Sequence, residues 1–519
     1  MKKYILILLA VVCMLLAGCG QKTDEPEISG DDQPQQTLPP GDQVFALNCS
    51  FSSPMNPYTT DNALNLVVGE LVYEHLVELD DTFQPHPGLF KSWSSEDGIT
   101  WVFQAELGRK FHDGHELTAD DIIYSINSAK ESQRYAGRLR NITEVTAGED
   151  GSIVVTLNRA NTQFPVLLTI PVIENNAMGY NYPSGTGPYC FSEDHTCLWA
   201  FGDHPERKNM PVDAIALLEY SSMEDVINAF DNSDLDLVCN DPTSSGDLSF
   251  SSVSESRQYN TTNLQYIGFN TDSRFFSNPA HRAAMVPAVD RSYAVSLLKD
   301  NAVAATAPIH PASPLFEAAM TVTTGYDLNL TASALTNAKV LDYDGDGERE
   351  YLAYEGSTEA ADLDLTLLVC SESKQKSAVC NKLASDLRQI GVPVTIKALP
   401  WEEYLEALEK GEFDMYYGEV RLTADFDLTP LLVYGGSVNY GNVTNPIYAE
   451  AINAYLAADD EHRAEACSAM LQVVSENLPI LPVCFEKHEV CAHRGVVGGL
   501  TPTQDNIFYK LSDWIINIG

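Results

Sequence analysis

Basic residues are scarce in this chain. Its 519 residues include 31 lysines and arginines against 73 aspartates and glutamates, so the formal net charge is −42. Such an acidic surface repels nucleic acid and anionic lipid headgroups, and we expect no nucleic-acid partner. The sequence also lacks the GxSxG, HExxH, P-loop and dinucleotide-binding patterns, so nothing in it indicates an enzyme. No cofactor is implied.

Cysteine pairs at the CxxC spacing of zinc sites are absent as well, although the chain has 11 cysteines. Cys13 lies in the N-terminal leader and Cys19 at its end, which leaves an odd number that cannot pair completely within the chain. Cys190–Cys197 and Cys484–Cys491 are spaced for short-loop disulfides. The alternative is that all are buried thiols, and we expect mostly free thiols.

The N-terminus reads as an export signal. Lys2 and Lys3 precede an apolar run that is short for a bilayer span. Leu16-Ala17-Gly18-Cys19 resembles a bacterial lipobox, which implies removal of residues 1–18 and a lipid on Cys19. Residues 19–42 contain almost no apolar side chains and are expected to form a disordered, lipid-anchored tether. The protein would then sit at the cell membrane, on its extracellular face or periplasmic side.

Two histidines at residues 112 and 115 raise the question of a metal site. Before them, alternate apolar side chains over residues 99–107 predict a half-buried strand, and after them Thr118 and Asp121 predict a capped helix. The histidines therefore fall in the turn between strand and helix, without the one-face spacing of a helical metal pair. We interpret this stretch as scaffold and predict no metal here.

The second half of the chain alternates helix and strand patterns. A helix is expected over residues 376–390, a strand over 392–399, a helix over 401–413 that Gly411 ends, and a strand over 414–420. Two further helices are expected within residues 448–477. This alternation indicates α/β lobes.

The chain resembles the family 5 extracellular solute-binding proteins, the peptide- and nickel-binding lipoproteins of ABC transporters. The pattern Lys/Arg-Phe-x-Asp-Gly followed by Leu-Thr-Ala-x-Asp is the strongest match, and "GTGPY", "YIGFNT", "GEFDM" and "ENLPILPV" keep the family's order. One departure is Pro287, which should kink or shorten a family helix. The matching side chains in the strongest segment are Pro87, Trp93, Phe111, Asp113, Gly114, Leu117, Thr118, Ala119 and Asp121.

The resemblance implies an α/β fold of two lobes, like the large type II periplasmic binding proteins with an extra subdomain. The implied main subdomain of lobe I comprises residues 43–80, 186–265 and 488–519, with residues 81–185 inserted in it. Lobe II would be residues 266–487. A hinge near residues 266–270 and 484–490 would let the lobes close on a ligand.

The resemblance also implies a ligand site. In the family's peptide binders an Asp in an "ADY"-like stretch holds the ligand's α-ammonium, and Asp425 falls on that Asp. Arg421, where the family often has Trp or Gly, could neutralise Asp425 or meet a ligand carboxylate. The other expected cleft residues are Asn56, Tyr73, Glu74, Phe269, Asn270, Asn439 and Tyr440.

The implied function is capture of oligopeptides and their delivery to a membrane permease, by a monomer. A peptide-signal sensor or chaperone is the first alternative, and a nickel or metal-chelate binding protein is the second. Residues 342–347 ("DYDGDG") match half of an EF-hand loop, but position twelve is Ala353 rather than Glu. We therefore interpret that loop as a turn.

Overall fold

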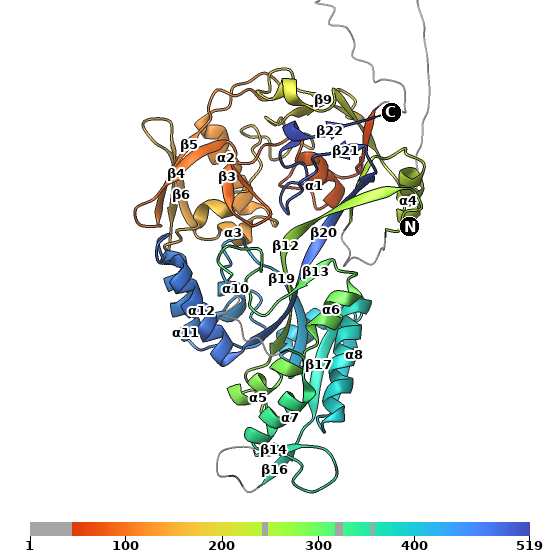
Figure 1. The fold of residues 1–519 in the computed structure, drawn as a ribbon. Coiled ribbons are helices and arrows are strands. Elements are labelled where there is room, and N and C mark those ends of the chain that lie inside the picture. The colour runs from red at the N-terminus through yellow and green to blue at the C-terminus, as the bar shows by residue number, and fades with distance from the viewer. Residues whose placement is uncertain (1–43, 241–247, 317–324, 353–356, 358, 519) are drawn as a thin grey trace, which may run out of the picture. The chain divides into compact units, whose positions relative to one another are not determined.

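Two long antiparallel strands run side by side through the protein (Figure 1). They are β12 (Ser254–Phe269) and β20 (Ile480–His493), and their register shifts between Asn260 and Leu264 and again between Gln265 and Tyr266. β20 pairs with β11 (Leu237–Asn240) towards one end, and β12 pairs with β19 (Met415–Arg421) towards the other. One sheet thus continues from lobe I, the half that contains β11, into lobe II, the half that contains β19. This computed structural model describes residues 44–240, 248–316, 325–352, 357 and 359–518.

The sheet has 11 strands in the order β18-β17-β19-β12-β20-β11-β1-β10-β9-β8, with β13 paired to β20. In lobe I, β1 lies parallel to β10 and β11, whereas β9 and β8 are antiparallel neighbours. The strands not yet given bounds are β1 (Phe45–Asn48), β8 (Tyr189–Phe191), β9 (Cys197–Ala200), β10 (Ala214–Leu218), β13 (Ala302–Ala304), β17 (Leu365–Cys370) and β18 (Val394–Leu399).

A separate four-stranded antiparallel sheet, in the order β4-β5-β7-β6, belongs to lobe I. The predicted strand is β5, and Trp101 and Phe103 are buried in it as its alternation requires. The predicted helix is α2; the Asp121 carboxylate accepts from the N–H of Thr118 at 2.9 Å, which ties down the helix start. The elements are β4 (Phe90–Ser94), β5 (Thr100–Ala105), α2 (Ala119–Glu131), α3 (Ala136–Leu139), β6 (Ile142–Ala147) and β7 (Ile153–Leu157).

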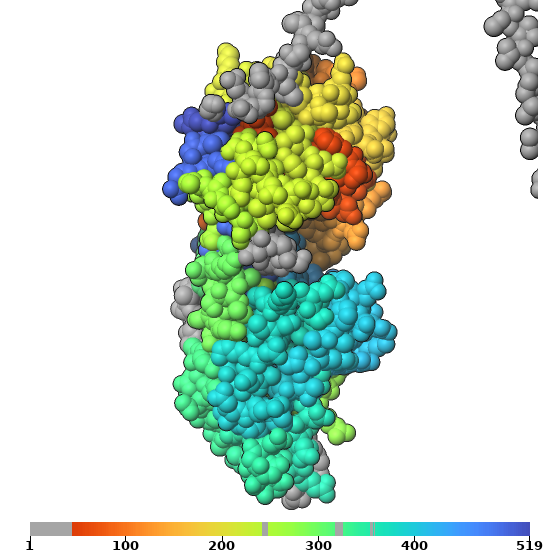
Figure 2. All heavy atoms as spheres, turned by 90° about the vertical axis from the view of Figure 1, so that its right-hand side faces the viewer, coloured from red at the N-terminus to blue at the C-terminus, as the bar shows by residue number. Residues whose placement is uncertain are grey.

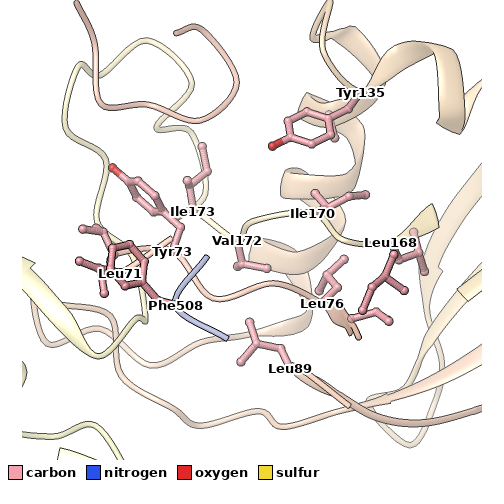
Figure 3. Close-up of a cluster of buried hydrophobic side chains, with 14 of the residues drawn as sticks. Leu71, Tyr73, Leu76, Leu89, Tyr135, Leu168, Ile170, Val172, Ile173 and Phe508 are labelled. Atoms are coloured by element: carbon pink, nitrogen blue, oxygen red, sulfur yellow. The ribbon is translucent and has the colours of Figure 1, made fainter. Parts of the chain in front are cut away.

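The largest hydrophobic core joins this subdomain to the rest of lobe I. Figure 3 shows part of it, where Leu168, Ile170 and Val172 of one segment lie near Leu76 and Leu89. The N–H of Leu76 donates to the carbonyl of Ile170 at 3.0 Å, so the two segments are also joined through their backbones.

Lobe II has the predicted helix–strand alternation. α8 (Lys374–Gln389) and α9 (Trp401–Lys410) cover opposite faces of its parallel strands, because Leu367 and Val369 of β17 pack with α8 while Leu368 packs with α9. Figure 2 shows the face on which α8 lies, with the cyan residues of this layer next to the green ones. Gly411 ends α9 in the left-handed conformation at φ 68°, as predicted.

Pro287 interrupts its helix as predicted. α5 (Pro279–Ala284) stops before it, a short 3-10 turn follows, and α6 (Arg291–Leu297) starts anew. The two predicted late helices are α11 (Ile447–Ala457) and α12 (Arg463–Asn477), which pack side by side (Figure 1). The remaining elements are α1 (Ala63–Gly69), α4 (Met223–Asp231), α7 (Leu328–Asn337), α10 (Thr429–Leu432), β2 (Val77–Leu79), β3 (Pro85–Pro87), β14 (Val340–Leu341), β15 (Glu350–Leu352), β16 (Ala360–Asp362), β21 (Val497–Gly498) and β22 (Ile515–Ile516).

The cysteines within the described residues are all free thiols, as expected. Cys484 and Cys491 lie in one strand, β20, where seven residues span ~23 Å at the usual rise per residue, far beyond disulfide reach. Cys190 of β8 faces Trp199 rather than Cys197. No helix in the described part of the chain is both long and apolar enough to cross a membrane. Cys19 lies outside the described residues.

Candidate functional site

A cavity of about 440 Å³ lies where lobe I and lobe II meet. This volume falls in the range of ~300–1,000 Å³ usual for small-ligand pockets. The wall from lobe I is formed by the segments around α1, α3 and residue 167 and by the loop at residue 505. The wall from lobe II is formed by the end of β19, the turn into α10 and the loop at residue 438. The lining residues with polar or charged side chains are Glu70, His75, Arg134, Tyr135, Arg138, Arg140, Thr169, Arg421, Thr423, Asp427, Ser437, Gln504 and Asp505.

Arginines dominate the lobe I wall. Arg134, Arg138 and Arg140 come from α3 and its flanks, and all three line the cavity. The guanidinium of Arg138 donates to Thr169, through Nη1 to Oγ1 at 2.8 Å and through Nη2 to the carbonyl at 2.6 Å. It also lies 4.8 Å from the ring centroid of Tyr135. Burial disfavours its charged form and lowers the pKa of Arg138.

Ion pairs join the two lobes across this cavity. Asp427 of lobe II accepts from Arg140 at 2.7 Å and from Arg159, both of lobe I. Arg421 of lobe II pairs with Asp505 of lobe I at 3.1 Å. Burial favours the neutral acid, but the guanidinium groups of Arg421 and Arg138 outweigh it and hold the pKa of Asp505 below its usual value.

Beside the ion pairs, a loop of lobe I is hydrogen-bonded to lobe II. The Asn161 side-chain amide donates to the Asp425 carboxylate at 2.8 Å, and the Thr162 N–H donates to the carbonyl of Leu456 at 2.8 Å. Asp425 is 1% exposed, and burial together with the nearby charge of Asp427 raises its pKa. The two lobes are therefore in contact in this structure, and Asp425 lies beside Ala424, which lines the cavity, without lining it itself.

One buried histidine belongs to the cavity lining. His75 is 4% exposed, and its Nε2 lies 3.2 Å from the Glu70 carboxylate while Nδ1 lies 3.6 Å from that of Glu78. Burial disfavours the charged imidazole, but the two carboxylates prevail and raise the pKa of His75 from 6.5 to about 9. A protonated imidazole has no lone pair for a metal ion, so this histidine is an ion-pair partner.

Of the side chains predicted from the sequence, Arg421 lines the cavity and Asp425 lies next to residues that line it. Asn439, in the loop that carries Ser437 and Val438, donates to the carbonyls of Val433 and Val443. Asn270 and Tyr440, also of lobe II, are not among the residues that line the cavity. Asn270 donates to the Phe413 carbonyl, and the ring centroid of Tyr440 lies 6.2 Å from that of Tyr416. Phe269 is fully buried in the lobe II core.

The predicted residues of lobe I lie elsewhere than the main cavity. Tyr73 and Glu74 line a second cavity of about 200 Å³, where Glu74 is paired with Arg109 at 2.8 Å. Asn56 is fully buried and donates to the carbonyls of Met178 and Tyr180, both at 3.0 Å. A ligand contact for any of these residues stays a prediction.

The arginines of α3 are the main feature that the sequence interpretation missed. Three arginines fall within residues 134–140 of a chain that is poor in basic residues, and that clustering was the available signal. Asp427 was not predicted as a site residue either, because the prediction named Asp425, two positions before it.

The two motifs weighed as metal sites have other contacts. His112 is hydrogen-bonded to the Gly187 carbonyl at 3.0 Å, outside the turn, and His115 to the Asp113 carboxylate at 2.8 Å. The two rings therefore have separate partners, and it is Asp113, His115 and Glu174 whose ligand atoms lie within 4.8 Å of one another. In the "DYDGDG" loop, the carboxylates of residues 342, 344 and 346 lie within 4.8 Å of that of Glu350, position nine of the loop. Glu350 is 5% exposed and accepts from the N–H of Tyr343.

The chain is similar to bacterial solute-binding proteins in both sequence and fold. The profile of the bacterial extracellular solute-binding proteins, family 5 (middle region), matches residues 84–442. Heme-binding protein A of Haemophilus influenzae is 22% identical over 93% of this chain and 94% of its own. Oligopeptide-binding protein AppA of Bacillus subtilis is 24% identical over 79% of this chain and 78% of its own. The structure of NikZ from Campylobacter jejuni in complex with Ni(L-His) superposes with a TM-score of 0.68 at 19% identity, covering 92% of this chain and 100% of that one.

Proposed function

Because the chain belongs to the family 5 extracellular solute-binding proteins of bacteria, we propose that it captures short peptides between its lobes and delivers them to the permease of an ABC importer. The observation that carries the proposal is the cavity of about 440 Å³ whose two walls come from different lobes. Lobes joined by a pair of continuous strands can move apart and close on a ligand.

Peptide is favoured over a metal chelate by the side chains of the cavity. His75 is the one histidine among the described residues that line it, and both its ring nitrogens face carboxylates. AppA is named for oligopeptides, whereas the NikZ complex holds Ni(L-His).

Asp425 is proposed as the partner of the peptide's α-ammonium. Its carboxylate is buried, and no lysine, arginine or histidine of the described chain lies within 4 Å of it. Its donors are neutral and comprise the Asn161 amide, the Asp427 N–H and the Thr423 side chain. A buried carboxylate with only neutral donors gains a charge-assisted hydrogen bond when an ammonium replaces one of them.

The proposal extends to the N-terminus. The lipobox-like Cys19 would carry the lipid that keeps a monomeric protein beside its permease at the membrane surface, with residues 20–42 as the tether.

The experiment is native mass spectrometry on residues 40–519, the compact unit of the chain, purified gently and then denatured to release its ligand. A set of co-purified masses that sequence as short peptides supports the proposal. A single non-peptide mass contradicts it. Binding of free and N-acetylated forms of the same peptide with equal affinity contradicts the role of Asp425.

A further inference from the structure

The cavity is basic although the protein is strongly acidic. Of the 31 lysines and arginines in the chain, four arginines line this one cavity. Two acids of the lining, Asp427 and Asp505, face these arginines, while the third, Glu70, lies 3.2 Å from His75 and is counted with it. The arginines thus exceed the acids that face them by two, four minus two, in a chain whose net charge is −42.

The excess resides on Arg134 and Arg138. Arg140 and Arg421 are paired with Asp427 and Asp505, respectively. By contrast, no carboxylate of the described residues lies within 4 Å of Arg134 or Arg138, whose side chains instead lie over the ring of Tyr135.

Arg138 is fixed in place and still has bonding capacity. Thr169 accepts a hydrogen bond from each terminal nitrogen of its guanidinium, and each of these nitrogens keeps a second N–H for a ligand. Arg134 is exposed and lines the cavity, with its guanidinium carbon 5.8 Å from the ring centroid of Tyr135. Two guanidinium groups at the same ring suit a ligand with two anionic groups.

The chemistry that fits guanidinium groups is a carboxylate. The planar fork of N–H donors matches two carboxylate oxygens, and such charge-assisted bonds are about twice as strong as neutral ones. Arg138 is partly buried and has no carboxylate of the described residues within 4 Å, so a ligand that brings negative charge to it is selected over a neutral one.

We infer that the peptides bound here are short and acidic, with Arg134 and Arg138 holding the C-terminal carboxylate and the carboxylate of a Glu or Asp side chain. The inference rests on the proposed function, because it names the class of peptide for that same cavity. The volume of about 440 Å³ limits the ligand to a few residues, which brings its two carboxylates close together.

The test is isothermal titration calorimetry with Ala-Glu-Ala, Ala-Gln-Ala and Ala-Lys-Ala, on residues 40–519 freed of ligand by unfolding and refolding. These tripeptides share size and termini and differ in one side-chain charge. We expect Ala-Glu-Ala to bind at least tenfold more tightly than Ala-Gln-Ala, with Ala-Lys-Ala weakest.

Two variants test whether these arginines cause the preference for the Glu peptide. Replacing the arginine that holds the side-chain carboxylate, by Arg134→Gln or Arg138→Gln, should reduce the Glu-over-Gln preference to threefold or less, and replacing the other should weaken binding of both peptides alike. Arg134 is exposed enough that its replacement leaves folding intact. Arg207→Gln is the matched control, since Arg207 is paired with Asp213 outside the cavity, and it should keep the full preference. Circular dichroism melting checks that each variant is folded.

The outcomes separate the inference from the proposed function. Tight binding of the Glu and Gln peptides with equal affinity, or a preference unchanged in both arginine variants, overturns the acidic class and leaves peptide binding in place. Absence of binding by every tripeptide, together with no co-purified peptide in mass spectrometry, overturns both.

Discussion

The ion pairs of Asp427 should decide how firmly the lobes close. Its carboxylate is 7% exposed and accepts from Arg140 at 2.7 Å, from Arg159, and from the N–H of Thr429 at 2.9 Å. Both arginines belong to lobe I, so opening the cavity breaks these two bonds while leaving Thr429 in place. Asp427→Asn keeps the shape of the side chain but removes the charge.

The magnitude follows from burial. A hydrogen bond to a charged group contributes ~1.5–3 kcal/mol, and breaking a fully buried ion pair costs ~3–5 kcal/mol. Arg140 is 37% and Arg159 23% exposed, and Arg159 keeps its contact with the Thr429 hydroxyl. We therefore expect the closed state to lose about 2–3 kcal/mol, which is a ~30- to 150-fold weaker peptide affinity.

The assay is calorimetry with the tightest-binding tripeptide of the panel, combined with small-angle X-ray scattering of the liganded protein. The variant should show a larger radius of gyration at equal peptide concentration. Asp213→Asn is the control, because Asp213 forms an ion pair of similar length, 2.6 Å to Arg207, but is 80% exposed and should change neither quantity. An affinity within twofold of wild type for Asp427→Asn would refute the reasoning.

Two further predictions concern the stability of the folded protein. Gly187→Ala should lower the melting temperature markedly, because a Cβ there would lie 2.5 Å from the backbone carbonyl carbon of Val72. Gly202→Ala is the control and should leave the melting temperature unchanged, because a Cβ there would have nothing within 4 Å. Equal melting temperatures of the two variants would contradict this packing. The stabilisation that His75 contributes should be fully present below its ordinary pKa of 6.5 and lost as the pH rises through about 9, because its folded pKa is the raised one. Urea unfolding of wild type and His75→Gln from pH 6 to 10 should show the difference between them shrinking, and a constant difference would argue against a charged imidazole.

Much of the fold could be predicted because its signals are local. The alternation around Phe103, the cap formed by Thr118 and Asp121, and the break at Pro287 each depend on a few neighbouring residues, and each is present in the structure. Helix–strand alternation in lobe II also follows from local periodicity, with α8, β18, α9 and β19 at the expected places.

The cavity was harder to predict because its members meet only when two lobes come together. Arg140 and Asp427 are 287 residues apart in the chain, and Arg421 and Asp505 are 84 apart. In sequence the α3 arginines have the spacing of a solvated helix surface, and nothing local shows that lobe II faces them. Asp425 was identified by family resemblance, which locates the loop but not which of its carboxylates faces the cavity.

The distribution of charge links ligand binding to closure. Arg140 and Arg421 reach across to acids of the opposite lobe, so they hold the lobes together, whereas Arg134 and Arg138 bring positive charge into the same space with no carboxylate of the described residues within 4 Å. Closing the empty cavity would desolvate that charge, which favours the open state. A ligand with two carboxylates removes the penalty and so binds the closed state better than the open one, which is the differential affinity that any ligand-driven closure requires. On this reasoning an acidic peptide should reduce the radius of gyration measured by small-angle scattering, and a neutral peptide of equal length should reduce it less at equal concentration.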